Sequence, residues 1–297
     1  SSLHRDRGGR CFVQRIIFRF QSPRREERAR MATQDKELFV TSLARGISVL
    51  KAFRAGSAEM TLTQVADASG LSPAVARRCL NTFVELGYVS KIDKRFGLTP
   101  RVLELSAGFL SSMNVSSVAA PHLRKVQDLT QDSASLTVLD GADIMHLCHL
   151  PSKGMFQFGV TAGSRVPAHV SATGQVLLAS QSDEVLADYF ARAELTRFTS
   201  RTLISEADLR DRFAEVDEQG FALLVDELDL GVTALGVTLM IDGVAVAGLS
   251  CATRSGYVTN EEFVETRLPA LHDAAVTLRA EIQNFPPLLH SLQSQSG

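Results

Sequence analysis

Residues 61–87 read TLTQVADASGLSPAVARRCLNTFVELG, and this stretch decides how the first part of the chain folds. Apolar residues at helical spacing predict a short helix that ends at Gly70. Ser72 and Pro73 then begin a longer helix, in the favoured order of a hydroxyl N-cap followed by proline at the first helical position. Two helices joined by a turn that contains glycine predict a helix-turn-helix.

The longer helix has two opposite faces. The apolar face is formed by Ala76, Cys79, Leu80 and Phe83. The other face offers two guanidinium groups and an amide among small residues, as a helix that enters a DNA groove does. From the two helices we expect DNA contacts by Thr63, Gln64, Ser72, Ala74, Arg77, Arg78 and Asn81.

The segments on both sides complete a winged helix-turn-helix. Residues 41–53 show a helical pattern, with Thr41 or Ser42 as its N-cap. Residues 88–92 alternate like a strand, a charged turn follows, and residues 96–99 return. In this predicted wing, phosphate contacts are expected from Lys91, Lys94 and Arg95.

Charge is distributed unevenly along the 297 residues, although the net charge is only −2. Residues 1–30 carry nine arginines against three acidic residues, and residues 31–100 carry nine basic against six acidic residues. Residues 101–297 carry 13 basic against 24 acidic residues. A basic front joined to an acidic body indicates a module that binds a polyanion. For residues 31–100 taken alone, a basic face without a partner is the simpler alternative.

Residues 1–33 are interpreted as a disordered basic extension, because Met31-Ala-Thr-Gln resembles a genuine start. An Arg-rich transit peptide is the other interpretation of this segment. The four cysteines are scattered without CxxC spacing, which predicts reduced thiols in a cytoplasmic protein. No apolar run reaches the length that a membrane span requires, so no membrane partner is expected.

The rest of the chain predicts an α+β domain. The winged helix-turn-helix is assigned to residues 34–100, a linker helix to 101–118, the second domain to 119–290 and a tail to 291–297. Alternating runs flank Asp140-Gly141 and again Asp242-Gly243, which predicts two β-hairpins. Helical patterns lie at 122–130, 171–180, 183–193, 206–219 and 261–284. Strands with helices segregated around them are typical of the α+β class.

Six stretches carry a resemblance to a known family: TSLARGISVLKAF, LTQVADASGLSPAVARRCLNTFVELGYV, PRVLEL, VLDGADIMHL, RVPAHVSATGQVLLA and GFALLVDELDLGVTALGV. In this order and spacing the chain resembles the IclR-type transcription regulators. Two of the stretches are similar to the branch that regulates aromatic catabolism through the β-ketoadipate pathway. The resemblance implies a GAF-like effector-binding domain behind the winged helix-turn-helix. It also implies a homodimer or a dimer of dimers that binds an inverted-repeat operator in double-stranded DNA.

The resemblance further implies functional residues, position by position. A basic residue of the recognition helix, a glycine in a pocket-facing helix, an acidic pair and a pocket serine match Arg78, Gly174, Asp226, Glu227 and Ser250. Ala234 also falls in the implied effector site, but it stands where many members have Cys or Ser. Ala252 stands where many have Ser. These two departures put polar ligand contacts from both positions in doubt.

The implied effector is a small organic acid. His149 lies where the pocket is expected, and Arg165 and His169 can pair with a carboxylate in an apolar cleft. A plain surface position explains Arg165 equally well. Small pocket residues leave room for a ring, so we expect an aromatic compound such as protocatechuate, 4-hydroxybenzoate or catechol. The alternative is glyoxylate or pyruvate, as in another branch of the family.

We expect no metal, cofactor or enzymatic activity. His146-Leu147-Cys148-His149 contains metal-binding residue types, but strict alternation along a strand places the two histidines on opposite faces. The sequence has no GxSxG, Walker A or GxGxxG pattern. An enzyme that acts on a small molecule in the second domain is one alternative. An adaptor that has lost DNA affinity is another, and the basic face of the recognition helix argues against it.

Overall fold

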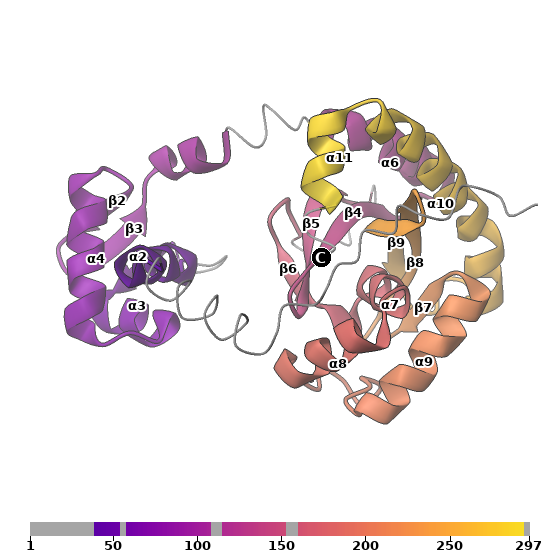
Figure 1. The fold of residues 1–297 in the computed structure, drawn as a ribbon, viewed down its shortest axis with the longest axis horizontal. Coiled ribbons are helices and arrows are strands. Elements are labelled where there is room, and N and C mark those ends of the chain that lie inside the picture. Colours follow the sequence, from indigo (N-terminus) through magenta and orange to yellow (C-terminus); the bar gives the residue numbers. More distant parts are fainter. Residues whose placement is uncertain (1–38, 54–57, 108–114, 153–159, 294–297) are drawn as a thin grey trace, which may run out of the picture. The chain divides into compact units, whose positions relative to one another are not determined.

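The computed structural model describes residues 39–53, 58–107, 115–152 and 160–293, and the chain separates into two compact units at Leu105 (Figure 1). The predicted basic extension lies outside the described residues. So do residues 108–114 of the predicted linker helix and the last four residues of the predicted tail.

The first unit is a helix-turn-helix with a three-stranded antiparallel sheet in the order β1-β3-β2. Its elements are α2 (Thr41–Ala52), β1 (Glu59–Thr61), α3 (Leu62–Ser69), α4 (Pro73–Glu85), β2 (Val89–Ile92), β3 (Arg95–Leu98) and the 3-10 helix η1 (Pro100–Val102). Val49, Val65, Leu80 and Phe96 meet in its core. The helix-turn-helix and the β2–β3 wing are as predicted, whereas β1 is a strand that the sequence pattern did not reveal.

Local signals explain most boundaries of the first unit. Thr61 and Gln64 form a reciprocal capping box that begins α3, and Gly70 ends the helix in the left-handed conformation. The N-cap of α2 is Val40, which makes no side-chain cap, so the prediction of Thr41 or Ser42 as N-cap was wrong.

The second unit is built on one six-stranded antiparallel sheet in the order β6-β5-β4-β9-β8-β7. Its helices are α6 (Val115–Thr130), η2 (Ala168–Val170), α7 (Ala172–Ala179), α8 (Asp183–Arg192), α9 (Glu206–Gln219), α10 (Asn260–Gln283) and α11 (Pro286–Gln293). Its strands are β4 (Ser133–Asp140), β5 (Asp143–Leu150), β6 (Arg165–Pro167), β7 (Ala222–Val225), β8 (Val232–Ile241) and β9 (Val244–Arg254). The predicted α+β class is confirmed.

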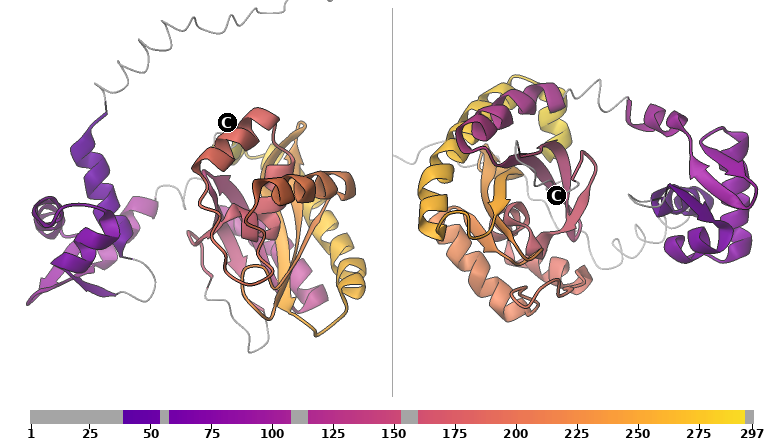
Figure 2. Two further views of the ribbon diagram at one scale, coloured as in Figure 1. Left: turned by 90° about the horizontal axis from the view of Figure 1, so that it is seen from below. Right: turned by 180° about the vertical axis from the view of Figure 1, so that it is seen from behind.

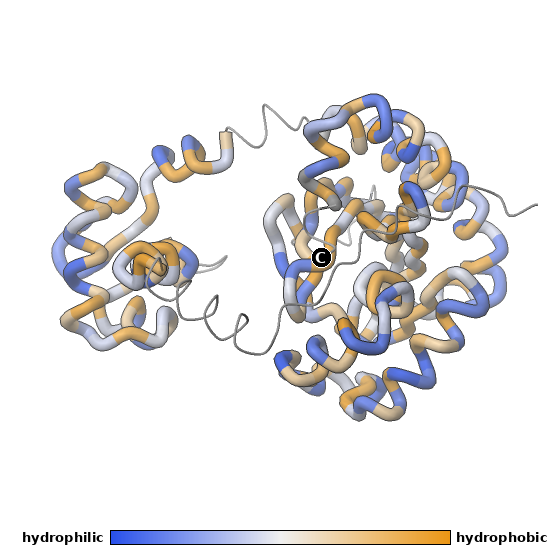
Figure 3. The backbone as a smooth tube through the Cα atoms, in the orientation of Figure 1, coloured by the Kyte–Doolittle hydropathy of each residue, from blue (hydrophilic) through white to orange (hydrophobic). Residues whose placement is uncertain are grey.

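Helices cover both faces of this sheet (Figure 2). The core on one face joins β4, β8 and β9 to α6, α10 and α11. On the other face α7 lies directly on the sheet, and α8 and α9 pack outside it through Leu186, Tyr189, Leu209 and Phe213. Figure 3 shows the difference in polarity: α9 is mostly hydrophilic, whereas the central strands are hydrophobic. Because α7 lies between the sheet and the two outer helices, it packs closely against the strands.

Two glycines permit that approach. A Cβ atom on Gly236 of β8 would lie 2.7 Å from the backbone carbon of Ala172, and one on Gly174 would lie 2.2 Å from the carbonyl oxygen of Ala168. Neither distance is tolerated, so α7 fits against β8 and η2 only because both positions lack a side chain.

One helix start differs from the prediction. A helix was predicted over residues 122–130, but α6 begins at Val115 and contains Pro121. Leu103–Ala107 are helical after η1, which agrees with part of the predicted linker helix.

Candidate ligand pocket and nucleic-acid interface

The recognition face predicted for α4 is exposed in the structure. Ala76 and Leu80 are fully buried, whereas the side chains on the opposite stripe are exposed: Ala74, Arg77, Arg78 and Asn81. Among the residues that the structure describes, no ion pair holds either guanidinium group. The two arginines are therefore available to an external polyanion.

The remaining predicted DNA contacts have different local roles. Thr63 is exposed at the start of α3, and Ser72 is the N-cap of α4 although its hydroxyl makes no capping hydrogen bond. The side-chain oxygen of Gln64 accepts a hydrogen bond from the Thr61 amide at 2.8 Å, which leaves only the Gln64 amide hydrogens for another partner. In the wing, exposed positions are held by Lys91, Lys94 and Arg95.

In the second unit, a cavity of about 440 Å³ lies between the sheet and the start of α7. Its walls combine ten apolar residues with ten polar or charged ones, so that the cavity can hold an apolar body and orient it through polar groups, as small-molecule sites do. The lining residues are Ser133, Ser135, Ile144, His146, His149, Val160, Ser164, Arg165, Val166, Val170, Ser171, Ala172, Leu224, Glu227, Leu228, Asp229, Val232, Ala234, Ser250 and Ala252.

A β-bulge brings both histidines of β5 into this pocket. Leu136 of β4 pairs with Cys148 and the next residue, Thr137, pairs with His146, so Leu147 is left as the extra residue. The rings of His146 and His149 lie edge to face, with centroids 6.0 Å apart. The prediction that they point to opposite faces was wrong because it assumed unbroken alternation. Cys148 packs in the apolar core.

Both imidazoles are held neutral in the pocket. Burial, together with the neighbouring His146, lowers the pKa of His149 to about 4. Burial also lowers the pKa of His146, although its Nδ1–H donates to the Ser164 carbonyl oxygen at 3.2 Å. His149 Nδ1 shares a hydrogen bond with the Ser135 hydroxyl at 2.8 Å. This side of the pocket therefore offers neutral donors and acceptors.

The N-terminal end of α7 contributes a further polar group. Ser171 is its N-cap and accepts a hydrogen bond from the Gly174 amide. The first amides of a helix have no partner within the helix, and the helix dipole favours negative charge there. Since Ser171 and Ala172 line the pocket, this end suits an anionic group.

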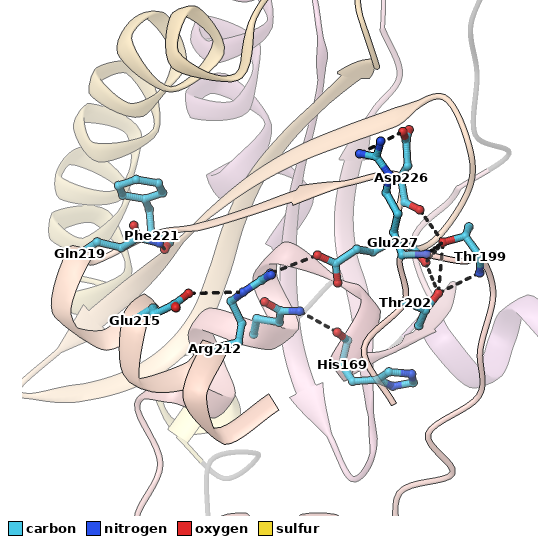
Figure 4. Close-up of polar contacts among 11 residues, drawn as sticks. His169, Thr199, Thr202, Arg212, Glu215, Gln219, Phe221, Asp226 and Glu227 are labelled. Carbon is cyan, nitrogen blue, oxygen red and sulfur yellow. Dashed lines mark hydrogen bonds and ion pairs between the residues drawn. The ribbon is translucent and has the colours of Figure 1, made fainter. Parts of the chain in front are cut away.

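The pocket lining also contains a carboxyl group. Glu227 follows β7, and its Oε1 atom accepts a hydrogen bond from Nη1 of Arg212 at 3.1 Å (Figure 4). The backbone around it is held by the loop before α9, since the hydroxyl of Thr202 donates to the Glu227 carbonyl oxygen at 2.7 Å and that of Thr199 to the Asp226 carbonyl oxygen at 2.6 Å.

The structure places five of the eight predicted effector residues in the lining: His149, Arg165, Glu227, Ala234 and Ser250. Arg165 lies there with its charge already balanced, because its Nε atom donates to Asp143 at 3.0 Å and its Nη1 atom contacts the Asp140 carboxylate. It is therefore not a free cation for a ligand.

Three predicted effector residues lie outside the lining. His169 is buried beside the pocket and its Nε2–H donates to the Thr196 carbonyl oxygen at 3.1 Å. Gly174 serves the close packing of α7. Asp226 stabilises its own turn, where its Oδ1 atom accepts hydrogen bonds from Gly231 and Ser255.

Several lining residues were not predicted, notably Ser133, Ser135, His146 and Ser171. Ser133 and Ser135 lie two positions apart on β4, so both side chains are on the same face of the strand. This alternation could have identified them from the sequence. Among the residues that the structure describes, no group of three or more His, Cys, Asp or Glu could hold a metal ion. Within the same residues, no helix has the length and apolar character of a membrane span.

Comparison with known families matches both units. Residues 42–93 match the IclR helix-turn-helix domain, and residues 107–280 match the C-terminal domain of the bacterial transcriptional regulator IclR. The Pca regulon regulatory protein of Pseudomonas putida is 32% identical over 235 residues, 78% of this chain and 81% of that protein. The p-hydroxybenzoate hydroxylase transcriptional activator of Acinetobacter baylyi is 31% identical over 249 residues, 82% of this chain and 92% of that protein.

Solved structures agree with these matches. A regulator from Rhodococcus sp. RHA1 is 35% identical with a TM-score of 0.70, over 83% of this chain and 99% of that one. The inducer-binding domain of PobR from Acinetobacter, a double mutant in complex with 3-hydroxybenzoic acid, is 28% identical with a TM-score of 0.52. That match covers 55% of this chain and 96% of that domain.

Proposed function

The chain belongs to the IclR family of bacterial transcriptional regulators, and we propose that it controls genes of aromatic-acid catabolism in response to a hydroxylated benzoate. It is a DNA-binding regulator and not an enzyme. We assign DNA binding to residues 34–100, effector binding to residues 119–290 and the link between them to residues 101–118.

The observation that carries this proposal is the pocket beside α7. Its volume lies within the range of roughly 300–1,000 Å³ that small-molecule sites occupy, and its apolar walls suit a ring. The start of α7 suits a carboxylate, while the neutral imidazoles and serines on β4 and β5 supply hydrogen bonds without a net charge. The effector contacts we propose are His149, Glu227, Ala234 and Ser250, together with His146, Ser135 and Ser171.

The relatives support the chemical class of the effector. The name of one relative concerns p-hydroxybenzoate, and the related inducer-binding domain holds 3-hydroxybenzoic acid. An aromatic ring with a carboxylate fits the apolar walls better than glyoxylate or pyruvate, which have no ring. Those two acids therefore become controls in the test below.

For DNA binding we propose two copies of the chain on an inverted repeat. A single recognition helix reads one half-site, and a two-fold pair places two such helices one helical turn apart. Effector binding in the second unit changes the placement of these helices, and the effector and the DNA then alter each other's affinity by the same factor.

A thermal-shift panel tests the proposal. A ligand at 100 times its dissociation constant adds about 2.7 kcal/mol, which for a unit of this size raises the melting midpoint by roughly 5–10 °C. We expect shifts with 4-hydroxybenzoate, 3-hydroxybenzoate or protocatechuate, but not with pyruvate or glyoxylate. A shift with glyoxylate or pyruvate alone would exclude aromatic-acid sensing and place the chain in a different branch of the family.

A further inference from the structure

The carboxyl group of Glu227 has one oxygen without a hydrogen bond. The side chain is only 6% exposed and lines the pocket. Its Oε1 atom is paired with Arg212 at 3.1 Å, whereas Oε2 has no hydrogen-bond partner among the residues that the structure describes (Figure 4). Buried polar atoms are normally paired, because an unpaired one loses the hydrogen bonds that water would give it. An unpaired acceptor that borders a cavity points to a ligand that donates.

Among the described residues, none makes a hydrogen bond of normal geometry to Oε2. The side-chain amide of Gln175 lies near and offsets part of the burial effect on the carboxyl group. One of its two Nε2 hydrogens is donated to the His169 carbonyl oxygen at 2.8 Å, and the other does not reach Oε2 with the geometry of a hydrogen bond. Burial raises the pKa of Glu227 overall, although Arg212 opposes this change. The Arg212–Glu227 pair also explains why the carboxyl group can be buried at all.

Glu227 and the polar groups of β5 come from separate parts of the sheet. Glu227 lies two residues after β7, which is an edge strand, and β8, β9 and β4 separate β7 from β5. His149 and Glu227 nevertheless line the same cavity of about 440 Å³, together with apolar side chains and serines of β4 and β9. A ligand that hydrogen-bonds to both residues needs two polar groups on an apolar body.

We propose that Oε2 of Glu227 accepts a hydrogen bond from a ring hydroxyl of the aromatic acid, and that this contact makes the hydroxyl a requirement for binding. This inference rests on the proposed function. A benzoate without the hydroxyl leaves Oε2 unpaired in the complex, and a site built around a hydroxyl strongly rejects an analogue that lacks it. A methoxy group at the same position has an oxygen that can accept a hydrogen bond but no hydrogen to donate to the Glu227 carboxylate.

Isothermal titration calorimetry with the full chain tests the inference. The ligands are 3- and 4-hydroxybenzoate, benzoate, and the methoxybenzoate that corresponds to the tighter hydroxybenzoate. Because a hydrogen bond to a charged group is lost, we expect benzoate and the methoxybenzoate to bind at least about 10-fold more weakly than the hydroxybenzoate.

The variant Glu227→Gln keeps the volume of the side chain and reverses its polarity in the pocket. Its amide oxygen faces Arg212, so the amide NH2 replaces Oε2 as the pocket-facing group. We expect the hydroxybenzoate to lose about 10-fold in affinity and the methoxybenzoate to gain. The matched control is Glu215→Gln, since Glu215 is the exposed second partner of Arg212, at 3.7 Å, and does not line the pocket. This control should preserve the wild-type ratio between the two ligands.

Two failures can be told apart. If no aromatic acid binds the wild-type chain, the proposed function is wrong and the inference falls with it. If a hydroxybenzoate binds but benzoate binds equally well, only the role of Glu227 is overturned. The affinity of the wild-type chain for the hydroxybenzoate relative to benzoate and the methoxybenzoate shows whether the hydroxyl is required, even when Glu227→Gln does not fold. An unchanged ratio in a folded Glu227→Gln variant also overturns the inference.

Discussion

The first unit carries its polar functional groups on an exposed helix face, whereas the second carries them in its interior. In α4 the apolar stripe is buried and Arg77 and Arg78 face outward. In the pocket, His146 is only 8% exposed and Glu227 only 6%. A substitution on an exposed face can alter binding without disturbing the core. A substitution among interior residues also alters core contacts, so ligand affinity and the free energy of unfolding should change together there.

The strongest test of this contrast uses one substitution in each unit. In Gly174→Ala the new Cβ would lie 2.2 Å from a backbone oxygen that cannot move aside. We expect a loss of about 3 kcal/mol in the free energy of unfolding of the second unit, together with loss of effector binding. Differential scanning calorimetry and ligand titration measure the two effects.

Gly46→Ala in α2 is the matched control. Its Cβ would lie 3.3 Å from the ring edge of Phe83, a side chain that can yield. Alanine also favours the helix by about 1 kcal/mol over glycine, so we expect the variant to remain within about 1 kcal/mol of wild type. Equal losses from the two substitutions would contradict the close packing assigned to α7.

The second prediction concerns pH and the half-buried imidazole of His149. The folded pKa of about 4 lies below the ordinary value of 6.5. Between these values the unfolded chain binds a proton that the folded chain does not, so stability falls as the pH decreases through this window. Above pH 6.5 the effect is absent. At pH 4 it is on the order of 1–3 kcal/mol, because solvent screens the partly exposed ring.

Comparison with His149→Gln isolates this effect, because glutamine does not titrate. Melting midpoints of both proteins at pH 7, 6, 5 and 4.5 should show the wild type losing more stability than the variant on acidification. The exposed carboxylates titrate equally in both proteins and cancel. Parallel profiles for the two proteins would show that His149 is not held neutral by burial.

The two units also differ in how far their sites follow from sequence. The recognition face of α4 depends on a single helix with a period of 3.6 residues, so local spacing was enough to place Arg77 and Arg78. Both Asp-Gly hairpins were likewise predicted from short-range signals. The pocket depends on pairing between strands. The bulge at Leu147, which turns His146 toward His149, leaves no local mark in the sequence.

The surroundings of other pocket residues were also beyond local sequence patterns. Arg165 on β6 is neutralised by Asp140 and Asp143 of the neighbouring hairpin, a contact between residues 22 and 25 positions apart in the chain. The family resemblance pointed to Gly174 and Asp226, but it could not separate residues that shape the pocket from residues that line it. Glu227, which the resemblance matched to an acidic pair of the family, lies in the lining, and only the structure shows that Arg212 pairs with one of its two carboxylate oxygens.

The smallest effects are expected in the first unit, where Arg78→Ala should be compared with Lys94→Ala. Arg78 stands on the recognition face, and a guanidinium group that reads a base edge contributes about 1–3 kcal/mol of discrimination. Lys94 lies at the tip of the wing. Its loss should weaken binding to every DNA sequence and reduce the slope of log K against log salt by about one unit.

Fluorescence anisotropy with an operator duplex and a scrambled duplex, at several salt concentrations, separates the two effects. Arg78→Ala should lower the ratio of operator to scrambled affinity, while Lys94→Ala should leave that ratio unchanged. Because both side chains are exposed, neither variant should shift the melting midpoint, in contrast to Gly174→Ala. If Arg78→Ala preserves the operator ratio, the face of α4 contributes only phosphate contacts, and the specificity of the first unit resides elsewhere on its surface.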